Sequence, residues 1–189
     1  MIDLKYRDLF ITGAGSGIGL ATVKLASAMG ARIAATVRGD EQRNVLRGYL
    51  DASNIHDLDV TDSAALEGAM AKSIERFDGL DGALACAGIL AVSTSTETTD
   101  AVWRDVLEVN LNGSFHLARA AARHMRERGN GSIVLTSSQI GLVGHPRAAA
   151  YAAPKSGING LVRAMAMELG PANVRINAVG PGPIATEMT

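Results

Sequence analysis

Tyr151 and Lys155 are the residues of this sequence whose types and spacing most directly suggest chemistry. They are four positions apart, so in a helix both side chains lie on one face, one turn apart. A lysine ammonium beside a phenol favours the phenolate and lowers the tyrosine pKa from its ordinary value of about 10. We therefore expect Tyr151 to act as an acid or base near neutral pH. An exposed helical pair without a function is the alternative, because this spacing is common.

Ser138 comes directly after residues 132–137, a segment rich in β-branched side chains that predicts a strand. Ligands of parallel sheets bind at the carboxyl ends of the strands. The Ser138 hydroxyl is therefore placed to hydrogen-bond a substrate carbonyl or hydroxyl, and capping of the strand end is its alternative role. His145 lies between Ser138 and Tyr151 and is a weaker candidate for substrate contact.

Residues 12–19 read Thr-Gly-Ala-Gly-Ser-Gly-Ile-Gly and join a predicted strand to a predicted helix. Glycines let the backbone turn tightly and approach a pyrophosphate, and a helix N-terminus offers free N–H groups and a positive dipole end. The spacing departs from the strict G-x-G-x-x-G pattern, because Ile18 stands where the third glycine would be. A tight turn without a ligand is the alternative. The residues expected to form the phosphate loop are Gly13, Gly15, Ser16, Gly17, Ile18 and Gly19.

The end of the second predicted strand, Thr36-Val37-Arg38-Gly39-Asp40, should determine which dinucleotide binds. An acidic side chain there would bond the 2′-hydroxyl of NAD, whereas an arginine would accept the 2′-phosphate of NADP. Val37 has no carboxylate and Arg38 is well placed, so the sequence favours NADP over NAD. An ordinary solvated arginine is the other role for Arg38. Asp40 is expected to be the N-cap of the next helix.

Short apolar segments alternate with longer amphipathic ones along the chain. The predicted strands cover residues 9–12, 32–37, 54–60, 84–87, 132–137 and 174–179, and the predicted helices cover 17–29, 40–50, 62–77, 99–128 and 149–169. Asp62 is a predicted N-cap, and Pro154 is expected near a first turn. Strands that are apolar on both faces and alternate with helices indicate a parallel sheet covered on both sides. The prediction is a single domain over residues 1–189 with a Rossmann-type, doubly wound α/β fold.

Composition excludes several classes of protein. The 189 residues include 18 Lys+Arg and 19 Asp+Glu, a balance that offers no basic surface for nucleic acid or an anionic membrane. One cysteine cannot form an internal disulfide, and the four histidines show no metal-ligand spacing. The apolar run at 82–92 is far shorter than the roughly 20 residues of a membrane helix. We expect a soluble cytoplasmic protein without a metal.

Taken together, these residues resemble the short-chain dehydrogenase/reductase family, over essentially the whole chain and in the right order. The resemblance implies strand order 3-2-1-4-5-6. Joint occurrence makes the match more specific than any single motif. The matching positions are Thr12, Gly13, Gly17, Ile18 and Gly19 in the cofactor loop, Asp59 and Val60 after the third strand, Ala87 and Gly88 after the fourth, Asn110 in a helix, then Ser138, Tyr151 and Lys155, and finally Pro181, Gly182 and Thr186.

The resemblance implies hydride transfer between nicotinamide C4 and the carbonyl carbon of a small, unidentified ketone or alcohol. Tyr151 would be the proton donor or base, Lys155 would lower its pKa and hold the nicotinamide ribose, and Ser138 would orient the substrate oxygen. Asn110 would anchor a water that relays protons to Lys155. The family also suggests a homodimer or homotetramer. NADP or NAD would contact the phosphate loop together with Arg38, Asp59, Val60, Ala87, Gly88, Tyr151, Lys155, Pro181, Gly182, Ile184 and Thr186.

The sequence departs from the family pattern at two places. Ala85 and Cys86 replace its usual pair of asparagines, and Cys86 is expected to be a small, unreactive residue beside the cofactor. Family members continue past Thr189 into a substrate lid and a seventh strand, so residues 174–179 should form an exposed sheet edge. We expect a piece of a longer enzyme, because every chemical residue is retained. The alternative is a non-catalytic dinucleotide-binding or interaction module.

Overall fold

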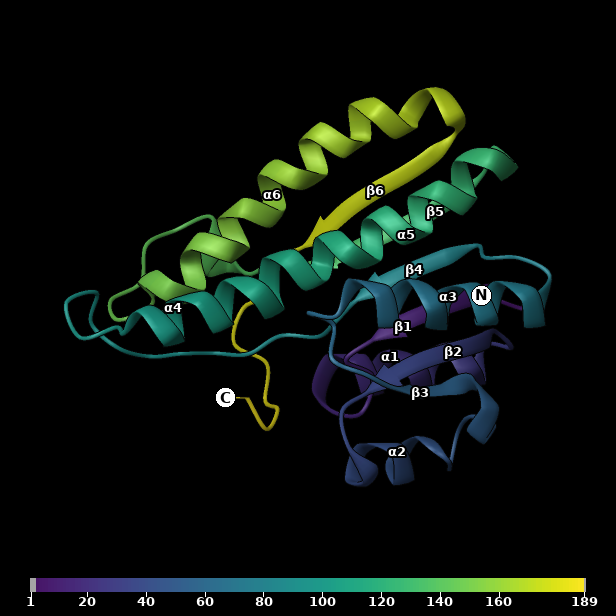
Figure 1. Cartoon of the computed structure of the whole chain (residues 1–189), viewed down its shortest axis with the longest axis horizontal. Helices are drawn as coiled ribbons and strands as arrows, with labels where there is room; N and C mark the ends of the chain where they lie inside the picture. The colour runs from purple at the N-terminus through teal and green to yellow at the C-terminus, as the bar shows by residue number, and fades with distance from the viewer. Residues whose placement is uncertain (1–2, 189) are drawn as a thin grey trace.

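Six parallel strands form one sheet in the computed structural model, which describes residues 3–188 (Figure 1). Their order is β3-β2-β1-β4-β5-β6, so the predicted order 3-2-1-4-5-6 is confirmed. The order reverses between β1 and β4, which is where doubly wound sheets bind their ligands. The strands are β1 (Asp8–Thr12), β2 (Arg32–Val37), β3 (Ile55–Asp57), β4 (Gly82–Ala85), β5 (Gly131–Thr136) and β6 (Val174–Val179).

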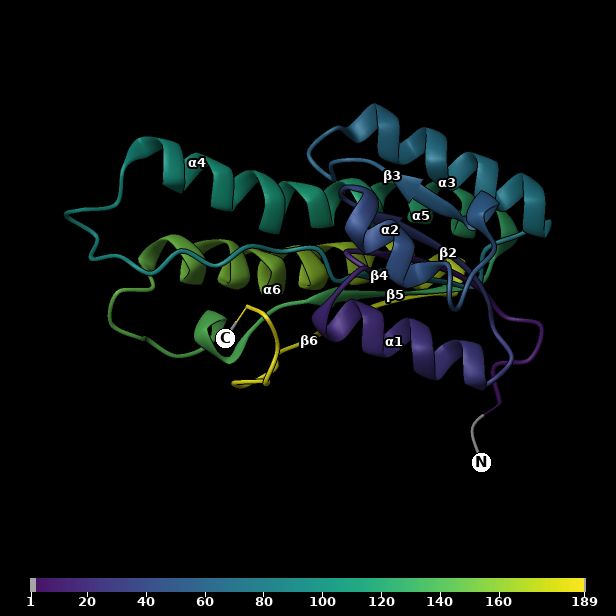
Figure 2. The same cartoon turned by 90° about the horizontal axis from the view of Figure 1, so that it is seen from below.

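Helices cover both faces of this sheet, with α1 on one side and α3, α4 and α5 on the other (Figure 2). Within residues 3–188, no helix is both long and apolar enough to cross a membrane. The helices are α1 (Gly17–Ala28), α2 (Asp40–Leu46), α3 (Ser63–Phe77), α4 (Asp100–Leu107), α5 (Gly113–Arg128) and α6 (Ala149–Leu169), with short 3₁₀ turns η1 (Ala52–Asn54), η3 (Gln139–Gly141) and η4 (Gly170–Ala172).

The strand sequences divide their side chains between two apolar clusters. In β1, Phe10 faces the larger cluster beneath α3, α5 and α6, whereas the next residue, Ile11, faces the smaller cluster beneath α1 and α2. Both side chains are fully buried. Successive strand residues point to opposite faces, so two apolar neighbours require cover on both sides. This is why unbroken apolar runs correctly predicted a parallel sheet.

The long helix predicted over residues 99–128 is two helices joined by a π turn, Glu108–Asn112. The predicted helical stretch is confirmed, because these elements follow one another without a break from residue 100 to residue 128. The π turn itself was not predicted, since π turns leave no clear periodicity in a sequence. They are frequent at functional sites, and this one carries Asn110.

The strand predicted over residues 54–60 is shorter than expected. β3 pairs with β2 only from Ile55 to Asp57, where β2 itself ends. Residues 58–60 therefore continue past the sheet, toward its ligand-binding edge. The predicted strand 84–87 likewise begins two residues earlier, at Gly82, and ends at Ala85.

Three local predictions have different outcomes. Asp62 is the N-cap of α3 and accepts a hydrogen bond from the Ala65 N–H, at 2.9 Å, as predicted. Asp40 is not an N-cap: Gly39 takes that position with φ of 91°, a conformation that glycine adopts without strain, and α2 begins at Asp40. Pro154 lies in the second turn of α6 rather than the first, so the helix tolerates an internal proline beside the pair of Tyr151 and Lys155.

β6 lies at one edge of the sheet and pairs with β5 along six residues, from Val174 to Val179. The exposed edge predicted for residues 174–179 is therefore present. Val174 and Ile176 point into the larger cluster, while Arg175 and Val179 are exposed.

Ile133→Ala should destabilise the fold by about 2–5 kcal/mol, because Ile133 is fully buried in β5, a strand paired on both sides, and its loss leaves a cavity. Met167→Ala is the control, since Met167 is 81% exposed, and it should change stability by less than about 0.5 kcal/mol. Urea unfolding of the variants measures both. Equal effects of the two substitutions would contradict this core assignment.

Candidate active site

One cleft runs along the carboxyl ends of all six strands, where the loops leave the sheet. Gly15 and Asn110 do not line it and lie just behind its wall. His145, the weaker candidate for substrate contact, is exposed and does not line it either. The other residues predicted for the site all line it: Gly13, Ser16, Gly17, Ile18, Gly19, Arg38, Asp59, Val60, Ala87, Gly88, Ser138, Tyr151, Lys155, Pro181, Gly182, Ile184 and Thr186.

The glycine loop takes a shape that side chains would prevent. Gly13 has φ of 63°, and a Cβ there would lie 2.4 Å from the Ala87 nitrogen. A Cβ on Gly19 would lie 2.2 Å from the Gly13 oxygen. Ser16 is the N-cap of α1 and its side chain makes no capping bond, while the first N–H groups of a helix lack acceptors within it. This cradle fits a pyrophosphate, whose negative charge the helix dipole stabilises.

At the β2 end of the cleft, Arg38 and Asp59 form an ion pair with 3.3 Å between guanidinium and carboxylate. The Arg38 side chain is 69% exposed, so this contact alone contributes little stability. Hydrogen bonding from the Thr61 backbone N–H lowers the pKa of Asp59, and Arg38 lowers it further. An exposed guanidinium and the carboxylate that it pairs with thus lie together at this end.

Tyr151 and Ser138 lie together at the β5 end of the cleft. Burial raises the pKa of Tyr151 above its ordinary value, and a hydrogen bond with Ser138 opposes that rise. The expectation that Lys155 lowers the pKa of Tyr151 is wrong for this structure. The Lys155 ammonium lies 5.4 Å from the centroid of the phenol ring, and it is bonded elsewhere.

Lys155 is almost wholly buried, at 3% exposure, and burial lowers its pKa to about 8. Its ammonium donates a 2.7 Å hydrogen bond to the Thr136 carbonyl at the end of β5. Ser137 donates from its hydroxyl to the Lys155 carbonyl at 3.0 Å. Two bonds in opposite directions therefore join α6 to the end of β5.

Cys86 is nearby, and burial raises the pKa of its thiol, which fits the inert role predicted for it.

The segment after β5 packs closely on α6. A Cβ on Gly141 would lie 2.8 Å from the Lys155 carbonyl carbon, so only glycine permits this contact. The Gly141 carbonyl accepts a hydrogen bond from the Ser156 hydroxyl at 2.9 Å. Ser138 begins this segment, and its side-chain oxygen accepts from the Ile140 N–H at 3.2 Å. Ser138 therefore caps the 3₁₀ turn η3 rather than the strand end, and this role coexists with the contact to Tyr151.

Asn110 is fully buried behind the cleft wall. Its side-chain oxygen accepts from the Ile89 N–H and its amide donates to the Ile89 carbonyl, both at 2.9 Å. A Cβ on Gly88 would lie 2.9 Å from the Asn110 oxygen. The π turn thus presents a side chain that fixes the loop leaving β4.

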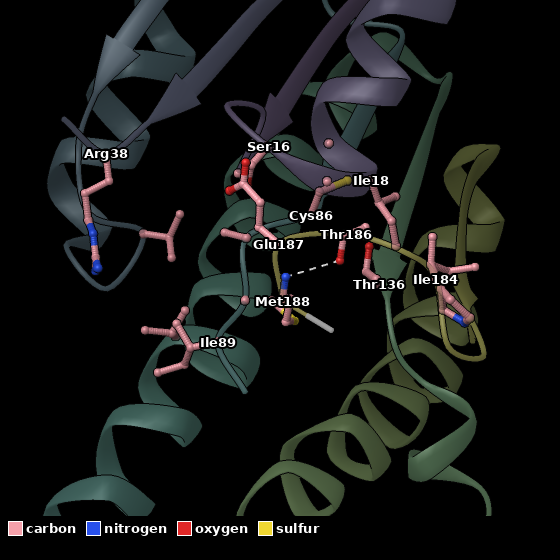
Figure 3. Close-up of a pocket in the computed structure, with 18 of the residues that line it drawn as sticks. Ser16, Ile18, Arg38, Cys86, Ile89, Thr136, Ile184, Thr186, Glu187 and Met188 are labelled. Atoms are coloured by element: carbon pink, nitrogen blue, oxygen red, sulfur yellow. Dashed lines mark hydrogen bonds between the residues drawn. The ribbon is translucent and has the colours of Figure 1, made fainter. Parts of the chain in front are cut away.

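The segment after β6 crosses the cleft, so that Glu187 and Met188 lie between Arg38 on one side and Ile184 on the other (Figure 3). The Gln139 N–H donates to the Pro181 carbonyl at 3.0 Å, which ties this segment to the one leaving β5. A Cβ on Gly17 would lie 3.5 Å from the Thr186 methyl group. Thr186 therefore approaches the phosphate loop directly.

Sequence reasoning missed several residues that line the cleft: Thr136, Ser137, Gln42, Ile89, Glu187 and Met188. Thr136 and Ser137 could have been found, because they end the strand that leads to Ser138. Nothing in the sequence indicated Gln42 as a site residue, since a glutamine in a short helix is common and has no distinctive spacing. Among residues 3–188, no group of His, Cys, Asp or Glu side chains could hold a metal ion.

A family model described as short chain dehydrogenase matches residues 8–189. The chain belongs to this family. It is similar to a 3-alpha-(or 20-beta)-hydroxysteroid dehydrogenase of Mycobacterium bovis, with 34% identity over 95% of this chain and 69% of the relative. It is also similar to the 3-oxoacyl-[acyl-carrier-protein] reductase FabG of Escherichia coli, with 33% identity over all of this chain and 78% of the relative.

Solved structures agree with this assignment. The structure of a levodione reductase superposes with a TM-score of 0.91 at 34% identity, covering 98% of this chain and 74% of the other. This chain is therefore an NAD(P)-dependent oxidoreductase that interconverts CH–OH and C=O groups.

Lys155 should give the folded protein a distinctive pH dependence. Its pKa falls from 10.5 to about 8 on folding, so between these values the unfolded chain binds the extra proton. The free energy of unfolding should therefore rise with pH across this window, by about 3 kcal/mol relative to Lys155→Met. Urea unfolding from pH 7.5 to 10.5 measures the difference. Lys24→Met, at an exposed site, is the control and should follow wild type. Parallel curves for Lys155→Met and wild type would contradict the buried ammonium.

Proposed function

We propose that this protein is an NADP(H)-preferring oxidoreductase that reduces a small carbonyl compound, or oxidises the matching secondary alcohol, with Tyr151 as acid and base. The observation that carries the proposal is the grouping of Ser138, Tyr151 and Lys155 at one end of a cleft whose middle is a phosphate-binding glycine loop. Neither half would be sufficient alone, because glycine turns and Tyr–Lys spacings are common.

The residues present fit a dinucleotide along the whole cleft. Arg38, Asp59 and Val60 would hold the adenosine, and the loop from Gly13 to Gly19 would hold the pyrophosphate. Lys155 and Tyr151 would hold the nicotinamide ribose. The bound nicotinamide supplies or accepts the hydride, and the protein supplies orientation and the proton. The nicotinamide itself would contact Ala87, Gly88, Pro181, Gly182, Ile184 and Thr186.

The preference for NADP rests on the end of β2. Val37 is buried and apolar, so no carboxylate is available to bond a 2′-hydroxyl. Arg38 follows it with an exposed guanidinium whose ion pair with Asp59 is solvated. A 2′-phosphate is a stronger partner for a guanidinium than a single distant carboxylate, because it accepts two charge-assisted hydrogen bonds.

The proton step follows from the environment of Tyr151. Because burial raises its pKa, the phenol stays protonated at neutral pH and is ready to donate to a developing alkoxide. Ser138, already bonded to the phenol, would hydrogen-bond the same substrate oxygen as Tyr151 and orient it. Lys155, with its pKa of about 8, is mostly charged at pH 7, and its ammonium would hydrogen-bond the nicotinamide ribose. The proton relay through Asn110 remains a prediction.

Apolar side chains that line the cleft include Ile89, Ile184 and Met188. Related proteins are described as acting on hydroxysteroids and on levodione, so cyclic ketones are the first compounds to screen. The homodimeric or homotetrameric state and the cytoplasmic location remain predictions.

Tyr151→Phe should lower kcat for carbonyl reduction by about 10²–10⁴-fold while raising the Kd for NADPH by less than about tenfold, because it removes the proton donor and only one of many contacts with the dinucleotide. Tyr49→Phe is the matched control at a surface position that is 45% exposed, and it should match wild type. Steady-state turnover of a ketone and calorimetric titration of NADPH give the two numbers.

Undiminished turnover by Tyr151→Phe would remove the catalytic assignment. NADPH binding with no turnover of any carbonyl compound by wild type would instead favour a non-catalytic dinucleotide-binding module.

A further inference from the structure

Gln42, in the first turn of α2, contacts both the glycine loop after β1 and the backbone of Arg38 after β2. A Cβ on Gly15 would lie 2.4 Å from the Gln42 Cβ and 2.7 Å from its side-chain oxygen, so the side chain lies directly against the phosphate loop. That same oxygen accepts a 3.1 Å hydrogen bond from the Arg38 N–H. Gln42 also lines the cleft. It therefore joins the glycine loop to the turn that follows β2.

Arg38 is held from three directions as a result. Gln42 fixes its backbone N–H, and Asp57 accepts from the next N–H, that of Gly39, at 3.0 Å. Asp59 contacts its guanidinium. Gly39 has φ of 91°, so the chain turns sharply directly after Arg38. Loss of the Gln42 bond would free one of the three restraints on the direction of the arginine.

The charge of the side chain at position 42 also matters. Asp57 and Asp59 already contribute carboxylates near Arg38, and Asp57 is paired with Arg43 at 3.4 Å. A third carboxylate at position 42 would face any phosphate bound by Arg38 and repel it at close range. The glutamine amide offers the acceptor that Arg38 needs without adding a negative charge.

We infer that Gln42 is a specificity-determining residue for the cofactor. Its neutral amide positions Arg38 and keeps the 2′ end of the adenosine site open to a phosphate. The inference rests on the proposed NADP(H) function and assigns part of the preference to a residue outside the strand end and the glycine motif.

Gln42→Glu is the sharpest test, because it keeps the acceptor oxygen and the size of the side chain while adding one charge. Calorimetric titration should show the Kd for NADPH rising at least about tenfold and the Kd for NADH changing less than about twofold. Asn44→Asp adds the same charge on the exposed face of α2 and should leave both values unchanged. Gln42→Met removes the acceptor alone and should weaken NADPH several-fold. Thermal unfolding without ligand verifies that each variant is folded.

These titrations distinguish the role of Gln42 from the NADP preference itself. If Arg38→Ala weakens NADPH binding but Gln42→Glu does not, the NADP preference stands and the role of Gln42 is overturned. Equal weakening of NADPH and NADH by Gln42→Glu would also overturn it, because the residue would then be merely structural. Equal binding of both dinucleotides by wild type would overturn the preference itself, and the inference with it.

Discussion

The hydrogen bond from the buried Lys155 ammonium to the Thr136 carbonyl joins α6 to β5, and the rest of the active site depends on this contact. Ser137 reinforces it with a bond in the opposite direction, to the Lys155 carbonyl. Tyr151 lies one helical turn before Lys155, so the same bonds place the phenol beside Ser138. A lysine buried to this extent is costly unless hydrogen-bonded, which makes the arrangement of α6 on β5 specific rather than approximate.

The remaining parts of the cleft are held by contacts between loops that leave neighbouring strands. The glycine loop after β1 touches the start of the loop after β4, at Gly13 and Ala87. The segment after β6 is bonded to the one after β5 through Pro181 and Gln139. Since parallel strands end at one edge of the sheet, each loop needs only a short reach to meet the next. The fold therefore assembles residues from six strand ends at one edge of the sheet.

Much of the fold and site could be predicted from the sequence because their signals are local. Apolar runs alternating with helical segments indicated the sheet, and Tyr151, Lys155 and Ser138 were identifiable by type and spacing. The features missed depend on tertiary contacts instead. The π turn around Asn110, the contact of Gln42 with Gly15, and the burial that raises the pKa of Tyr151 all arise from packing between segments distant in sequence.

The central claim is that one cleft holds NADP(H) with its phosphate loop, Arg38 and the pair of Tyr151 and Lys155. Thermal unfolding of the unaltered chain in increasing NADPH and NADH tests it most directly, because a ligand that binds the native state raises the unfolding temperature. We expect a saturable rise with both dinucleotides, reached at lower concentration with NADPH. An unfolding temperature that neither dinucleotide changes would contradict it.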